Sequence, residues 1–87
     1  MRESDVQAIF VQFKCAPGRA YAVADALVES VEEISEVYST SGHYDLIAKF
    51  YLDAGRDVGH FVTERLQTVE GVTQTFTTVA FKAFGRG

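Results

Sequence analysis

The stretch Ser39–Phe50, with the sequence STSGHYDLIAKF, decides how this chain is expected to fold. It reads as the end of one strand, a tight turn at Gly42 and a long apolar strand leading out. The turn joins two halves of the chain that each read as strand, helix, strand. It is also the most polar, hydroxyl-rich segment between two apolar ones. Any small-molecule site is therefore expected to include part of it.

The first half begins with a strand predicted over Val6–Cys15. This strand is apolar on both faces for much of its length, with Phe10 on the second face. A sheet that carries helices on one side needs only one apolar face, so the second face requires a partner. Pro17 and Gly18 then predict the opening turn of a helix. A short strand over Val37–Ser41 completes this half.

The second half begins with a strand predicted over Tyr44–Leu52. Asp53 is the expected N-cap of the next helix, because its carboxylate can accept hydrogen bonds from free helix amides. Gly71 stands where a C-terminal cap belongs. The last and longest strand is predicted over Val72–Phe84.

The predicted order βαββαβ defines a ferredoxin-like α+β fold. Right-handed crossovers place both helices on one face of a four-stranded antiparallel sheet. We expect one domain over residues 1–87, with a core of about residues 5–84. The other face should carry Phe10 or its neighbours, aromatic side chains of the third strand and the threonines of the last strand. So apolar a face on a small monomer predicts a dimer that packs sheet to sheet.

Composition narrows the classes of partner. The net charge is −4 and the isoelectric point is about 5.0, which argues against direct nucleic-acid binding. The first residues are polar and lack the apolar stretch of a signal peptide. No apolar run approaches the roughly 18 residues that a membrane span requires. A cytoplasmic protein without a membrane partner is predicted.

Residues that could carry catalysis are few. Cys15 is the single cysteine, so it can form no intramolecular disulfide, and no Cys/His cluster has metal-binding spacing. His43 and His60 have no acidic, Ser or Cys partner at a motif spacing. No glycine-rich phosphate loop occurs. We therefore predict no catalytic residue, no cofactor and no metal.

The last strand contains a regular row of hydroxyl groups. Thr73, Thr75 and Thr77 alternate, so their side chains should share one face. The preference of threonine for strands explains such a row without any ligand. Because the row starts directly after Gly71 and Val72, at one end of the sheet, a ligand-binding role is the other interpretation.

Two motifs resemble those of a known family. Ser41–Ile47, SGHYDLI, resembles the (T/S)G-x-(Y/F)-D-(L/I)-(L/I) hairpin of the Lrp/AsnC transcription regulators. Gly71 and Val72, followed by Thr75 and Thr77, resemble the signature before the last strand of the same family. The resemblance is to the C-terminal effector-binding module, the RAM domain, in a stand-alone form without a helix-turn-helix domain.

This resemblance implies a sheet-to-sheet dimer, with dimers associating into rings of eight or ten subunits. It also implies an amino acid or similar small effector bound between dimers, and full-length Lrp/AsnC regulators as further partners. DNA binding is not carried over. The implied ligand contacts are Thr40, Ser41, Gly42, His43, Tyr44, Asp45, Thr73, Thr75 and Thr77.

Three functions remain open at this stage. The first is an effector-binding and oligomerisation module, in which Asp45 either accepts a hydrogen bond from a ligand ammonium or ties the turn together. The second is a cofactor-free dimeric enzyme of the monooxygenase or isomerase type, for which His43, Tyr44 and His60 are the available ionisable groups. The third is a structural adaptor that a partner protein recognises.

Overall fold

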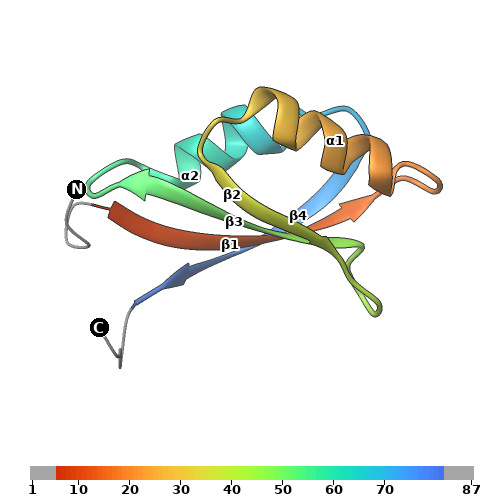
Figure 1. The fold of residues 1–87 in the computed structure, drawn as a ribbon, viewed down its shortest axis with the longest axis horizontal. Coiled ribbons are helices and arrows are strands. Elements are labelled where there is room, and N and C mark those ends of the chain that lie inside the picture. Colours follow the sequence, from red (N-terminus) through yellow and green to blue (C-terminus); the bar gives the residue numbers. More distant parts are fainter. Residues whose placement is uncertain (1–5, 82–87) are drawn as a thin grey trace.

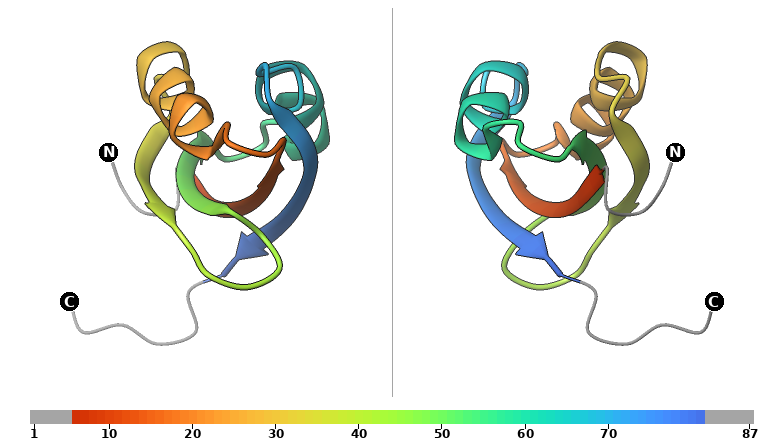
Figure 2. Two further views of the ribbon diagram at one scale, coloured as in Figure 1. Left: turned by 90° about the vertical axis from the view of Figure 1, so that its right-hand side faces the viewer. Right: turned by 90° about the vertical axis from the view of Figure 1, so that its left-hand side faces the viewer.

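The sheet and its two helical segments were analysed in a computed structural model, which describes residues 6–81. The strands form one antiparallel sheet in the order β2-β3-β1-β4, and both helical segments cover the same face (Figure 1, Figure 2). The expected ferredoxin-like fold is confirmed. The elements are β1 (Val6–Cys15), α1 (Ala20–Ser30), β2 (Ile34–Ser39), β3 (Leu46–Asp53), α2 (Val58–Phe61), η2 (Val62–Leu66) and β4 (Val72–Ala80).

The core lies between the sheet and the helices. From Ile9 to Cys15 every second residue of β1 is buried there, and Ile9, Val11 and Phe13 have no exposed surface. Phe50 of β3 meets Phe61 of α2 edge to face, with 5.6 Å between ring centroids. The other buried apolar residues are Cys15, Val23, Leu27, Val31, Leu46, Ala48, Leu52, Val62 and Leu66.

Pro17 and Gly18 do not open the first helix, as we had predicted. They form the centre of a turn in which the Arg19 N–H donates to the Ala16 carbonyl at 3.0 Å. Gly18 has φ 77°, so the turn has the Pro-Gly pattern and the left-handed third residue of type II. The helix begins after this turn, at Ala20.

The predicted cap of the second helix is also wrong. Asp53 is the last residue of β3, and a loop through Gly55, with φ 90°, separates it from the helix. Asp57 is the N-cap, and its Oδ1 accepts a 3.0 Å hydrogen bond from the His60 N–H. The helical segment then widens into a π-helical turn over Val62–Leu66.

Gly71 is a turn glycine rather than the helix cap, because η2 already ends at Leu66. Its φ of 98° favours glycine. A Cβ at this position would lie 2.9 Å from Val23 Cγ2, so the turn also packs directly on α1. The Gly71 carbonyl accepts a 2.8 Å hydrogen bond from the Ala16 N–H, which fixes the start of β4 beside the end of β1.

Strand boundaries shift by a few residues from the predicted ones. β2 begins at Ile34 and ends at Ser39, and β3 begins at Leu46 and ends at Asp53. β4 ends at Ala80, and the predicted continuation beyond residue 81 lies outside the described residues.

The sheet face away from the helices, called the open face below, carries a mixture of aromatic, apolar and polar side chains. Register places Thr75 opposite Phe13 and Thr77 opposite Val11, both of which are buried against the helices. The expectation that the threonine row lies on the open face is therefore wrong, and Thr78 lies there instead. The open face comprises Ala8, Phe10, Gln12, Glu36, Tyr38, Ile47, Lys49, Tyr51, Phe76 and Thr78.

Candidate functional site

The loop between β2 and β3 holds the candidate contacts from Thr40 to Asp45. The Thr40 N–H donates to the Asp45 carbonyl at 3.0 Å, and the Thr40 hydroxyl donates to the Tyr44 carbonyl at 2.8 Å. Gly42 has φ 115°, which favours glycine at the tip, although an added Cβ would touch nothing. Ser41 and His43 flank it and are exposed.

Asp45 anchors this loop to the end of β1. Its backbone N–H donates to the Phe13 carbonyl at 2.9 Å. Its side-chain Oδ2 accepts a 2.7 Å hydrogen bond from the Cys15 N–H, which extends the pairing of β1 with β3. Burial and the nearby Asp45 carboxylate raise the pKa of the Cys15 thiol. The geometry thus gives Asp45 a turn-stabilising role, one of the two roles considered for it.

A second set of contacts joins the loop to its surroundings. The Lys14 ammonium donates to the His43 carbonyl at 2.9 Å. The His43 ring packs edge-on against Tyr44, and the Tyr44 ring lies 6.3 Å from that of Phe76 on β4. The loop curves past the end of the sheet toward the open face (Figure 1). Its backbone is therefore held by neighbours on both sides.

The threonine row has a different environment. The Thr75 hydroxyl accepts a 2.9 Å hydrogen bond from Gln67 Nε2, just after the second helical segment. The Thr73 hydroxyl donates to the Lys14 carbonyl at 3.1 Å, beside an irregularity in the pairing of β1 with β4. Thr77 is half-buried further along β4. A hollow of about 380 Å³ is lined by Gln67, Val72, Thr73, Gln74 and Thr75.

The structure brings the two motifs to the same end of the sheet, on either side of β1. It does not place them in one hollow, because no residue from 40 to 45 lines the one that contains Thr73 and Thr75. The loop reaches β4 through Tyr44 and Phe76, whereas Thr75 points toward the helices. Within one chain, the candidate contacts therefore form two separate groups.

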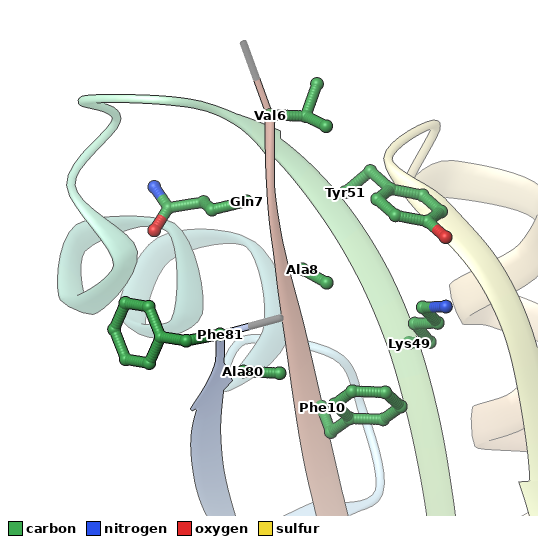
Figure 3. A pocket seen from close by; sticks show the side chains of 8 residues that line it. All are labelled: Val6, Gln7, Ala8, Phe10, Lys49, Tyr51, Ala80 and Phe81. Carbon is green, nitrogen blue, oxygen red and sulfur yellow. The ribbon is translucent and has the colours of Figure 1, made fainter. Parts of the chain in front are cut away.

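A second hollow, of about 610 Å³, lies on and beside the open face near the other end of the sheet (Figure 3). The Lys49 ammonium lies over two rings, 4.9 Å from the Tyr51 centroid and 5.6 Å from the Phe10 centroid. The apolar second face of β1 predicted a covered surface here, but not this hollow. Its lining residues are Val6, Gln7, Ala8, Phe10, Lys49, Tyr51, Ala80 and Phe81.

An acidic side chain beneath the second helical segment is held by two arginines. Glu33 pairs with Arg56 at 2.7 Å and with Arg65 at 3.5 Å, and both guanidinium groups also lie over the Phe61 ring. Burial opposes ionisation, but the hydrogen bond from Arg56, the backbone and both positive charges together lower the pKa of Glu33. This cluster fastens the loop before α2 to the loop after α1.

Neither histidine lies in a cluster of potentially catalytic side chains among residues 6–81. His60 is exposed and pairs with Glu64 at 3.2 Å across one helical turn. His43 contacts the Tyr44 ring. Among residues 6–81, no three His, Cys, Asp or Glu side chains are grouped as metal ligands. In the same range, no helix is long and apolar enough to cross a membrane.

The sheet order, the helices on one face and the two motifs at one sheet end define a ferredoxin-like domain. The sequence matches the Lrp/AsnC ligand binding domain over residues 8–86, so the chain belongs to this family. The "HTH-type transcriptional regulator FL11" of Pyrococcus furiosus is 33% identical over 73 residues, covering 84% of this chain and 47% of the regulator. The chain spans about half the length of the curated relatives it matches.

Solved structures agree with this assignment. TTHA0845 from Thermus thermophilus is 34% identical, with a TM-score of 0.73 over 92% of this chain and 99% of that one. The transcriptional regulator NMB0573 from Neisseria meningitidis, solved as a complex with L-Met, is 17% identical and shares the fold. Its TM-score is 0.77, over 92% of this chain and 53% of that one.

Proposed function

We propose that this chain is an effector-binding and oligomerisation module that binds an amino acid or a similar small metabolite. It binds no DNA itself and catalyses no reaction. Full-length Lrp/AsnC regulators are its proposed protein partners, together with further copies of itself. The observation that carries the proposal is family membership over residues 8–86, with both family motifs at one end of the sheet.

The chemistry at that end suits a free amino acid. An amino acid offers a carboxylate, which needs N–H or hydroxyl donors, and an ammonium, which needs acceptors. The exposed loop around Gly42 supplies backbone amides. The Thr75 hydroxyl accepts from Gln67, so its own O–H is left to donate to the carboxylate, whereas the Thr73 O–H already donates to the Lys14 carbonyl and leaves only its oxygen as an acceptor. Asp45 Oδ2 already accepts from Cys15, so only its other oxygen is assigned to the ligand ammonium. The L-Met complex of NMB0573 is an example of such a ligand on the same fold.

The separation of the two motifs within one chain supports a site completed by another copy. We propose that the open face receives a second copy, sheet to sheet. Tyr38, Tyr51 and Phe76 are 57%, 44% and 54% exposed on it, which leaves a large apolar area to bury. Dimers then associate into rings of eight or ten, so that the loop of one dimer approaches the threonine row of the next.

The test is thermal stability against the common amino acids at millimolar concentration, with native mass recorded in parallel. A ligand present at 100 times its dissociation constant stabilises the folded state by about 2.7 kcal/mol. Thr75→Val keeps the shape and strand preference of the residue but removes the hydroxyl, so it should abolish the ligand-induced shift. Thr63→Val is the matched control, because Thr63 is an exposed threonine of η2, on the helical side of the sheet and outside both motifs.

A selective shift in the wild type and in Thr63→Val, absent from Thr75→Val, would support the proposal and identify the ligand class. A shift that survives in Thr75→Val would remove the threonine row from the site. A flat response to every amino acid, with intact oligomers, would instead favour the structural adaptor.

A further inference from the structure

The Lys49 ammonium lies at the centre of the open face, although an interface between apolar faces needs no charge there. Lys49 belongs to β3, an inner strand, and its neighbours across the sheet are Glu36 on β2 and Phe10 on β1. Thr78 continues this row on β4. The Lys49 side chain is half-buried, and its ammonium lies over the rings of Phe10 and Tyr51. Within residues 6–81 its ammonium forms no ion pair.

Covering this face would remove water from the Lys49 ammonium. A charged group that is buried without a partner is strongly unfavourable, so an acceptor must lie close to the ammonium once the face is covered. The open face itself provides one, because Glu36 lies in the same row. The Tyr38 hydroxyl donates a hydrogen bond to Glu36 Oε1, which holds this carboxylate at the face. The row thus carries one cation and one anion.

We propose that Lys49 and Glu36 determine which sheet the open face accepts: a second copy of this chain, paired so that each Lys49 meets the partner copy's Glu36. The inference rests on the proposed sheet-to-sheet dimer and adds its specificity determinant. A two-fold axis repeats every contact, so a face with both charges in one row is complementary to itself. A related sheet with a cation opposite Lys49 is rejected, because like charges in an interface are strongly repulsive.

The test compares Lys49→Glu and Glu36→Lys, measured separately and then mixed. Each variant carries like charges in the row, so each homodimer should weaken, on the order of a hundredfold in dissociation constant. In the mixture, opposite charges face each other across the interface. Heterodimers should therefore exceed the statistical half of all dimers by native mass spectrometry, with one variant labelled with ¹⁵N.

The mixture separates pairing between copies from pairing within a chain. In both variants the two charges of one chain have the same sign, so no intrachain pair can form in either. A preference for heterodimers can then arise only between copies. Asp25→Lys is the charge-reversal control, because Asp25 is exposed on α1, on the helical side of the sheet. It should leave the dimer dissociation constant unchanged.

The possible failures are distinguishable. A wild-type chain that is monomeric at tens of micromolar would overturn both the proposed dimer and this inference. A dimeric wild type whose variants dimerise with unchanged affinity, or mix statistically, would overturn the role of Lys49 and Glu36 alone. Lys49→Met adds a further check. This variant should still dimerise, and it should no longer pair preferentially with either charged variant when the two are mixed.

Discussion

Replacing Asp45 with alanine should destabilise the fold through the end of β1. The Cys15 N–H donates to Asp45 Oδ2 at 2.7 Å, and the substitution leaves this N–H of a buried residue without a partner. Hydrogen bonds to charged groups contribute about 1.5–3 kcal/mol, and an orphaned buried donor costs a similar amount. We expect a loss of about 2 kcal/mol. In a chain of this size that corresponds to a fall in melting temperature of about 10 °C.

The assay is urea unfolding followed by circular dichroism at fixed protein concentration, because dimerisation would otherwise change the midpoint. Asp45→Asn keeps an acceptor oxygen but loses the charge, so its loss should be about half as large. Asp25→Ala, on the exposed part of α1, is the control and should change stability by less than about 0.5 kcal/mol. An Asp45→Ala protein as stable as this control would refute the turn-stabilising role.

Two further changes test the packing around the site. Gly71→Ala forces a Cβ to 2.9 Å from Val23 Cγ2 at φ 98°. Gly42→Ala shares only the positive φ, so Gly71→Ala should lower the free energy of unfolding by more. Equal losses of unfolding free energy would contradict the close approach of Gly71 to Val23. Glu33 has a lowered pKa, so its stabilisation is present above its ordinary value of 4.5 and disappears as the pH falls through the folded-state pKa. Glu33→Gln should reduce the loss of unfolding free energy as the pH falls below 4.5. If the variant loses as much stability in acid as the wild type, the pairing of Glu33 with Arg56 is not the cause of that loss.

Most of the fold could be predicted from the alternation of apolar residues along the strands and from the Gly, Pro and Asp residues between the elements. From Ile9 to Cys15 every second residue of β1 is buried, as the alternation of the sequence predicts, and the cover over its apolar second face stays a prediction. The prediction that Pro17 opens the first helix was wrong because a Pro-Gly pair fits the middle of a type II turn at least as well as a first helical turn. The prediction of Asp53 as N-cap was wrong because the loop through Gly55 places the start of the helix after Asp57. Both aspartates suit an N-cap, so residue type alone could not distinguish them.

The face of the threonine row could not be read from the sequence. Thr73, Thr75 and Thr77 alternate with Gln74, Phe76 and Thr78, so neither set is clearly apolar and the period of two does not say which points inward. Register against β1 decides it, by placing Thr75 opposite the buried Phe13. The irregularity between Lys14 and Cys15, at the end of this pairing, has no signature in the sequence.

The end of β1, from Phe13 to Cys15, connects the proposed ligand site to the proposed interface. Asp45 bonds to Phe13 and Cys15, and the Thr73 hydroxyl bonds to the Lys14 carbonyl, so both motifs are tied to the same short segment. The same strand carries Phe10 on the open face. A ligand can shift assembly only by its difference in affinity for the assembled and separated states. If the site is completed between dimers, that difference is built in, because separated dimers would offer the ligand only one of the two motifs at each site.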